Sequence, residues 1–211
     1  MKNKAEYTLY LCTDRELMST PTIEESVEQA IQGGCTIVQL REKECTSLEF
    51  YQLALRVREI TEGYHVPLLI NDRVDIALAA DAQGVHIGQS DLPAAVVRKL
   101  IGPEKILGVS AATEAEAVQA VQQGADYLGI GAMYATATKT DAQLVSRQEL
   151  EKIRNAVAVP LVAIGGMNKH TVPLLRNTGI DGIAVVSAIV AQEHIAEAAA
   201  ELLRIFRGES E

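Results

Sequence analysis

One pattern recurs eight times along the chain and constrains its fold more than any other feature. A short apolar run is followed by a polar or glycine-containing loop and then by a longer stretch with helical spacing. The predicted strands lie near residues 8–12, 37–41, 68–71, 85–87, 106–110, 127–131, 161–164 and 182–186. The predicted helices lie near residues 23–32, 47–63, 74–79, 93–100, 114–123, 147–156, 171–177 and 195–206. Strict alternation predicts a parallel sheet, and eight units predict an α/β fold closed into a TIM (β/α)8 barrel.

Length and composition agree with a single barrel. The 211 residues match the lower end of the range for this architecture, so we expect one domain spanning residues 1–211. Apolar residues make up 48% of the chain and aromatic residues only 4%. A core of branched aliphatic side chains, which fill parallel barrels, is therefore available.

The charge balance limits the partners that the chain could bind. Nineteen basic and 28 acidic residues give a net charge of −9, which argues against nucleic acid or an anionic membrane as the main partner. The expected partners are small molecules, and an anionic substrate would need a local basic cluster. The sequence does not indicate an oligomeric state.

Cysteine usage and the N-terminal residues indicate a compartment. Cys12, Cys35 and Cys45 are odd in number and lack metal-ligand spacing, so they are expected to be reduced thiols. No stretch fits a signal peptide or a membrane span. We therefore expect a cytoplasmic protein.

Two acids follow neighbouring predicted strands. Asn71 and Asp72 end the third strand, and Asp91 follows the fourth. Carboxyl ends of parallel strands meet at one face of a barrel, where ligands bind. Two carboxylates and an amide there suit Mg²⁺, which completes its shell with water and substrate phosphate. Alternatively, Asp72 caps the next helix and Asp91 occupies a turn.

The second predicted strand ends in basic residues. Alternation along a strand places Gln39, Arg41 and Lys43 on one face, toward the end of the barrel. An inward Arg and Lys in an acidic protein suit a diphosphate, because Arg offers a planar fork and Lys a compact charge. The alternative is a layer of ion pairs with Glu42 or Glu44.

A second anion site is predicted after the seventh and eighth strands. Gly165 and Gly166 follow one of them, and Val186 and Ser187 end the other. Loops in these positions form the usual phosphate site of this barrel, because backbone N–H groups converge there. The long loop 132–145 is small and polar with one cation, Lys139, as a lid over a phosphate would be.

Ser110 ends the fifth predicted strand. Its motif contains no His or Asp, so a hydrogen-bonding role is favoured over a nucleophilic one. His86 lies within an apolar strand and is expected to be a wall or core residue rather than a ligand.

Several motifs together resemble those of the thiamine-phosphate synthase family. They are QLREK at 39–43, GVHIGQSD at 84–91, GVSAAT at 108–113, TATKTDA at 136–142 and AVVSAI at 184–189. The resemblance runs through all eight units. It implies an Mg²⁺-dependent transferase that joins 4-amino-2-methyl-5-pyrimidinylmethyl diphosphate to 4-methyl-5-(2-hydroxyethyl)thiazole phosphate and releases diphosphate.

The resemblance also implies roles for individual residues. Asp72 and Asp91 match the Mg²⁺ ligands. The matches to the pyrimidine diphosphate site are Gln39, Arg41, Lys43, Asn71, Ser110 and Lys139. The matches to the thiazole phosphate site are Thr136, Thr138, Gly166, Val186 and Ser187. Among them, Arg41, Lys43, Ser110 and Lys139 would act in catalysis. Ala112, Ala132 and Ala135 depart from the residues common in the family, which bears on the stiffness of the lid.

Two other functions are compatible with the same barrel. A related thiazole tautomerase would share the thiazole phosphate site, but it would not need the acid pair together with Arg41, Lys43 and Lys139. A non-catalytic barrel that binds a phosphorylated ligand and regulates a partner would explain the phosphate loops but not the acid pair.

Overall fold

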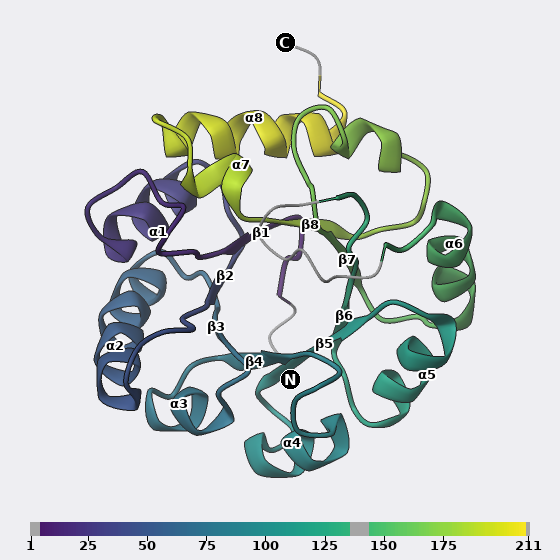
Figure 1. Ribbon diagram of the computed structural model, residues 1–211, viewed down its shortest axis with the longest axis horizontal. Helices are drawn as coiled ribbons and strands as arrows, with labels where there is room; N and C mark the ends of the chain where they lie inside the picture. The colour runs from purple at the N-terminus through teal and green to yellow at the C-terminus, as the bar shows by residue number, and fades with distance from the viewer. Residues whose placement is uncertain (1–4, 136–143, 210–211) are drawn as a thin grey trace.

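Eight parallel strands form a closed barrel in the computed structural model, which describes residues 5–135 and 144–209. The strands neighbour one another in chain order, and β1 pairs with β8 to close the ring. The helices form an outer ring around them (Figure 1). The strands are β1 (Leu9–Cys12), β2 (Ile37–Leu40), β3 (Leu68–Asn71), β4 (Gly84–Ile87), β5 (Ile106–Ala111), β6 (Tyr127–Ile130), β7 (Leu161–Ile164) and β8 (Gly182–Val185). The predicted barrel is confirmed.

Four of the helices begin where the sequence places a capping side chain. The hydroxyl groups of Thr22, Thr46, Thr113 and Ser146 each accept a hydrogen bond from a backbone N–H in the first turn of the next helix. The helices of the repeated units are α1 (Ile23–Gln32), α2 (Ser47–Gly63), α3 (Val74–Ala79), α4 (Ala94–Ile101), α5 (Glu114–Gln122), α6 (Arg147–Ala156) and α8 (Ile195–Arg207).

The seventh and eighth units differ from the prediction. The helix expected at 171–177 is only the 3₁₀ turn η1 (Val172–Leu175), because Arg176 has an extended backbone and Asn177 then turns the chain with a positive φ of 63°. A four-residue helix that the periodicity did not predict, α7 (Ser187–Val190), follows β8 directly. The last unit therefore has two helices, the first of which lies at the end of a strand.

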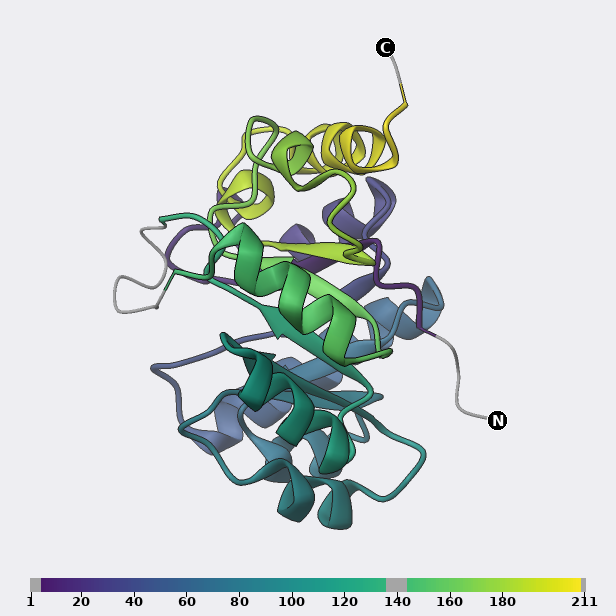
Figure 2. The same ribbon diagram turned by 90° about the vertical axis from the view of Figure 1, so that its right-hand side faces the viewer.

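Alternating side chains divide the core into two parts. Outward residues such as Val38, Leu40 and Leu128 pack beneath the helices, and the side view shows α5 and α6 lying against the strands (Figure 2). Inward residues fill the barrel itself: Tyr10, Cys12, Ile37, Leu69, Ile106, Tyr127, Val162 and Ala184. Because the interior is filled at this level, a ligand has access only at the ends of the barrel. The end formed by the carboxyl ends of the strands is called the barrel mouth below.

The helices in the described part of the chain are too short or too polar to cross a membrane.

Candidate active site

Gln39 and Arg41 share the inward face of β2 and the residues just after it, as predicted. Gln39 is buried and donates from Nε2 to the hydroxyl of Tyr10 over 2.7 Å. Arg41 lies above it, with its side chain 19% exposed, and its Nη1 is 3.2 Å from the Asp14 carboxylate. Asp14 follows β1 and was not anticipated. It holds the Arg41 guanidinium at the barrel mouth and offsets part of its charge.

The structure does not support the alternative in which Glu42 or Glu44 pairs with the basic cluster. Glu42 turns away from Arg41, is 4% exposed and forms an ion pair with Arg15 over 3.0 Å. Lys43 is exposed and forms an ion pair with none of the described residues. The alternative of an ion-pair layer between this cluster and Glu42 or Glu44 is therefore wrong, because Asp14 is the acid that pairs with Arg41.

Asn71, Asp72 and Asp91 come together where β3 and β4 end. The Asp72 N–H donates to the carbonyl of His86 over 2.8 Å, which fixes the turn after β3 against β4. Asp72 has a φ of +62°, a left-handed conformation that aspartate tolerates better than most residues. Asp91 accepts a 2.7 Å hydrogen bond from the Gly88 N–H. The backbone of Asp72 and the carboxylate of Asp91 are thus fixed at adjacent strand ends.

The acid pair fits a divalent cation. Burial, then the charge of Asp91, raises the pKa of Asp72 to about 6, although Asn71 and Arg41 act in the opposite sense. Two carboxylates this close repel each other, and a cation between them would remove the repulsion. No group of three His, Cys, Asp or Glu ligands occurs among residues 5–135 and 144–209. Two carboxylates beside an amide suit a hard ion such as Mg²⁺, because it takes water and phosphate oxygens as further ligands.

The alternative role of Asp72 as a helix cap is not what the structure shows. Helix α3 begins after Arg73, and no side chain caps its first turn. The Asp72 carboxylate instead interacts with the side chains of Asn71 and Asp91 at the barrel mouth. The alternative for Asp91 is partly correct, since its carboxylate does close a turn by accepting from Gly88.

Ser110 has a histidine partner that its own motif did not reveal. His86 Nε2 lies 2.9 Å from Ser110 Oγ, and His86 Nδ1 lies 2.7 Å from the hydroxyl of Tyr127. His86 pairs with Gly108 across β4 and β5, and this register brings its ring beside Ser110, two residues further along the strand. The motif of Ser110 contains no His because this partner comes from the neighbouring strand.

The opposite side of the mouth, after β7 and β8, has a backbone arrangement that suits an anion. Gly165 and Gly166 after β7 both have positive φ angles, 91° and 66°. The Gly166 carbonyl accepts hydrogen bonds from the side chains of Asn168 (3.1 Å) and Thr171 (2.7 Å), which sequence reasoning missed. Across from it, α7 begins at Ser187, directly after Val186, so its first N–H groups have no acceptor within the helix.

Three of the predicted site residues cannot be placed. Thr136, Thr138 and Lys139 lie outside the described residues. The other ten fall into two groups: Gln39, Arg41, Lys43, Asn71, Asp72, Asp91 and Ser110 on β2 to β5 or just after these strands, and Gly166, Val186 and Ser187 after β7 and β8.

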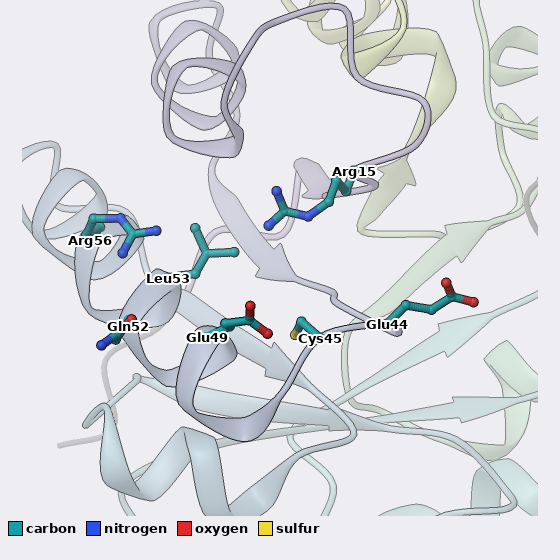
Figure 3. A pocket seen from close by; sticks show the side chains of 7 residues that line it. All are labelled: Arg15, Glu44, Cys45, Glu49, Gln52, Leu53 and Arg56. Atoms are coloured by element: carbon teal, nitrogen blue, oxygen red, sulfur yellow. The ribbon is translucent and has the colours of Figure 1, made fainter.

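A hollow of about 310 Å³ lies beside the mouth rather than in it. Its lining residues are Arg15, Glu44, Cys45, Glu49, Gln52, Leu53 and Arg56 (Figure 3). Three of its four charged groups are already engaged: Arg15 with Glu42, Arg56 with Glu24, and Glu49 in the capping box of α2. The chemistry described above lies at the strand ends and not in this hollow.

Comparison with known proteins supports the same family as the motifs. The family model described as thiamine monophosphate synthase matches residues 9–189. The chain belongs to this family. A thiamine-phosphate synthase of Clostridium beijerinckii is 61% identical over 206 residues, covering 98% of this chain and 99% of the relative. One of Ruminiclostridium cellulolyticum is also 61% identical, covering 98% of each chain.

A solved structure of the same family shares the whole fold. The thiamine phosphate pyrophosphorylase from Pyrococcus furiosus is 39% identical and superimposes with a TM-score of 0.89, covering 97% of both chains. The family membership that the motifs predicted is confirmed.

Proposed function

We propose that this chain is a thiamine-phosphate synthase. It joins 4-amino-2-methyl-5-pyrimidinylmethyl diphosphate to 4-methyl-5-(2-hydroxyethyl)thiazole phosphate and yields thiamine phosphate and diphosphate. The observation that carries the proposal is the 61% identity to synthases over almost the entire chain. The two groups of polar residues at the barrel mouth add a physical reason, because the reaction needs separate sites for two anionic substrates.

The diphosphate group is assigned to the mouth between β2 and β5. Asp72 and Asp91 would hold Mg²⁺, which when bound neutralises charge on the diphosphate oxygens. Arg41 provides a planar guanidinium, preset by Asp14, and Lys43 and Lys139 provide point charges. Gln39, Asn71 and Ser110 would orient the pyrimidine diphosphate by hydrogen bonds.

The thiazole phosphate is assigned to the opposite side of the mouth. Gly166, Val186 and Ser187 would bind its phosphate through backbone N–H groups and a hydroxyl, and Thr136 and Thr138 would complete the site. The placement of α7 at the end of β8 supports this assignment, because a short extra helix at this point is a common feature of phosphate sites in such barrels.

The arrangement favours a dissociative displacement. The bond between the pyrimidinylmethyl carbon and the diphosphate oxygen breaks with its electrons leaving on the diphosphate, and the aminopyrimidine stabilises the resulting cation. The thiazole nitrogen then donates an electron pair to that carbon. The protein needs no covalent nucleophile: its residues bind the departing charge and hold the two rings in line. A loop closed over the mouth would keep water from the cation.

A two-substrate assay tests this function. The purified protein, supplied with Mg²⁺ and both substrates, should form thiamine phosphate, and neither substrate alone should give it. Binding of the thiazole phosphate without any product, in protein with its native fold, would contradict the synthase and favour the tautomerase or the non-catalytic regulator.

Lys139 provides one prediction. Lys139→Ala should lower kcat about 10²-fold, the usual effect of removing one charge-stabilising donor, because the diphosphate would leave with less compensation. Steady-state kinetics at saturating substrates measures the effect. Lys152→Ala, which removes an exposed lysine paired with Glu149 on α6, is the matched control and should retain activity. Equal rates for the two variants would exclude the role of Lys139.

Ser187 provides a second prediction. Ser187→Ala should raise the KM for the thiazole phosphate about tenfold, because one hydrogen bond to a charged phosphate is lost. The KM for the pyrimidine diphosphate should rise less. Varying each substrate in turn measures the two constants. If the KM for the diphosphate substrate rises instead, the thiazole phosphate site must lie elsewhere.

A further inference from the structure

A chain of hydrogen bonds crosses the interior of the barrel beneath the mouth. Gln39 Nε2 lies 2.7 Å from the Tyr10 hydroxyl, and that hydroxyl lies 2.7 Å from the hydroxyl of Tyr127. The Tyr127 hydroxyl lies 2.7 Å from His86 Nδ1, and His86 Nε2 lies 2.9 Å from Ser110 Oγ. This hydrogen-bond network begins at Gln39 and ends at Ser110, both assigned above to the pyrimidine diphosphate. Its central members, two tyrosines and a histidine, lie deeper in the barrel.

One direction of this hydrogen-bond network gives every hydroxyl proton an acceptor. The Gln39 amide nitrogen donates to the Tyr10 oxygen, and either phenol could donate in the bond between Tyr10 and Tyr127. The assignment in which the Tyr10 O–H donates to Tyr127 gives both phenol protons an acceptor. Tyr127 then accepts from Tyr10, and its own O–H donates to His86 Nδ1. In this assignment Nδ1 accepts and carries no proton, and the ring donates from Nε2 to Ser110 Oγ.

The direction decides what Ser110 can do. If its oxygen accepts from His86, its O–H can donate only to a different acceptor. His86 in this state is a donor to Ser110 and cannot take the serine proton. The Ser–His contact is therefore unlike the pair of a serine hydrolase, in which the histidine acts as the base.

We propose that Tyr127 is a positioning residue that holds His86 as the Nε2–H tautomer and thereby presents Ser110 as a hydrogen-bond donor to the pyrimidine substrate. The role of Ser110 toward substrate rests on the proposed function. The tautomer of His86 does not, since it follows from contacts within the protein.

The surroundings of Tyr127 fix its hydroxyl in place. Burial raises the pKa of Tyr10 and of Tyr127 well above the usual value for a phenol, so both hydroxyls keep their protons. A Cβ at Gly108 would overlap the Tyr127 ring, and a Cβ at Gly129 would lie 3.0 Å from His86 Cε1. The Tyr7 ring packs against Tyr127 with a centroid distance of 4.8 Å. The two glycines thus leave room for the Tyr127 and His86 rings, and Tyr7 packs against one side of Tyr127.

Nitrogen NMR of the protein without substrate tests the tautomer. With ¹⁵N-labelled histidine, and His86 assigned by its absence in His86→Gln, the wild type should show a proton on Nε2 and none on Nδ1. Tyr127→Phe should shift the Nδ1 resonance, because that nitrogen loses its donor. Tyr7→Phe, which removes a neighbouring phenol hydroxyl outside the chain, should leave the resonance unchanged. A proton on Nδ1 in the wild type, or no shift in Tyr127→Phe, would overturn the proposal.

Kinetics tests the consequence for the reaction. Tyr127→Phe should lower kcat about tenfold, the effect of one misplaced hydrogen bond, and leave the KM for the thiazole phosphate unchanged. Tyr10→Phe, which breaks the chain one link earlier, should act in the same direction, and Tyr7→Phe should not. Kinetics of Tyr127→Phe indistinguishable from those of Tyr7→Phe would overturn the positioning role.

The two measurements separate this inference from the proposed function. An active synthase with a proton on Nδ1 of His86 would refute the proposed direction of the hydrogen bonds and leave the proposed function standing. An inactive protein with the Nε2–H tautomer and the Tyr127→Phe shift would refute the synthase and the substrate role of Ser110, and leave the tautomer assignment standing.

Discussion

Asp72→Ala is expected to lower turnover about 10³-fold and to weaken the dependence of the rate on Mg²⁺. The estimate follows from the several kcal/mol that a bound cation contributes to a charged transition state, at about 1.4 kcal/mol per factor of ten. Asp72 and Asp91 are the two acids that the strand ends bring together, so the loss of either leaves one carboxylate for the ion. Rates measured across a series of Mg²⁺ concentrations give both quantities.

Removing the charge of Asp72 should also stabilise the protein in the absence of metal. Its pKa is raised from 3.8 to about 6 in the folded state, so the folded protein binds more protons than the unfolded chain between these values. The contribution of Asp72 to stability is therefore most favourable below about pH 4 and is lost as the pH rises through 6. Asp72→Asn should melt at a higher temperature than the metal-free wild type at pH 7, and the difference should shrink near pH 4.

Asp75→Asn is the matched control for these measurements. Asp75 is an exposed carboxylate three residues away that pairs with Arg73. Its replacement should leave the Mg²⁺ dependence intact. A normal Mg²⁺ titration in Asp72→Ala, or a lower melting temperature for metal-free Asp72→Asn at pH 7, would count against the acid pair as the cation site.

Arg41→Met should lower kcat/KM for the pyrimidine diphosphate by about 10³-fold. This factor is the lower end of the rate effects known for arginines that stabilise charge on a transferring phosphoryl group. Asp14 orients the planar guanidinium of Arg41 at the mouth. Because the Arg41 side chain is largely shielded from water, solvent weakens its attraction for an anion only slightly. Arg41→Lys should recover only part of the loss, because lysine lacks the fork. Initial rates at low substrate concentration give kcat/KM directly.

Two variants distinguish the role of Arg41 from a general loss of charge. Asp14→Asn should have a smaller effect than Arg41→Met, because the guanidinium remains but is held less firmly. Arg56→Met, which removes an exposed arginine paired with Glu24, should have no effect. If Arg41→Met and Arg56→Met behaved alike, Arg41 would not bind the diphosphate.

Much of the barrel could be predicted because each of its units is local. Leu68–Asn71, Leu161–Ile164 and the helices at Ile23–Gln32, Ser47–Gly63 and Arg147–Ala156 have the predicted bounds, since short apolar runs and capping hydroxyls mark them. The inward alternation of Gln39 and Arg41 also follows from the period of a strand. These properties depend on neighbours along the chain.

The unpredicted features depend on contacts between distant segments. Tyr10 and Tyr127 are 117 residues apart, and only the closed barrel brings their hydroxyls together. The same holds for Asp14, which reaches Arg41 from the preceding strand, and for His86 beside Ser110. Helix α7 has no capping side chain, and its four residues are too few for a helical period.

The most direct test of the central claim is to follow thiamine phosphate and diphosphate together, with both substrates present, in Mg²⁺ and after chelation of the metal. The account predicts equal release of the two products in Mg²⁺ and a large fall in both when Mg²⁺ is removed. Unequal release, or a rate that is unchanged by chelation, would contradict a Mg²⁺-assisted synthase at the Asp72 and Asp91 site.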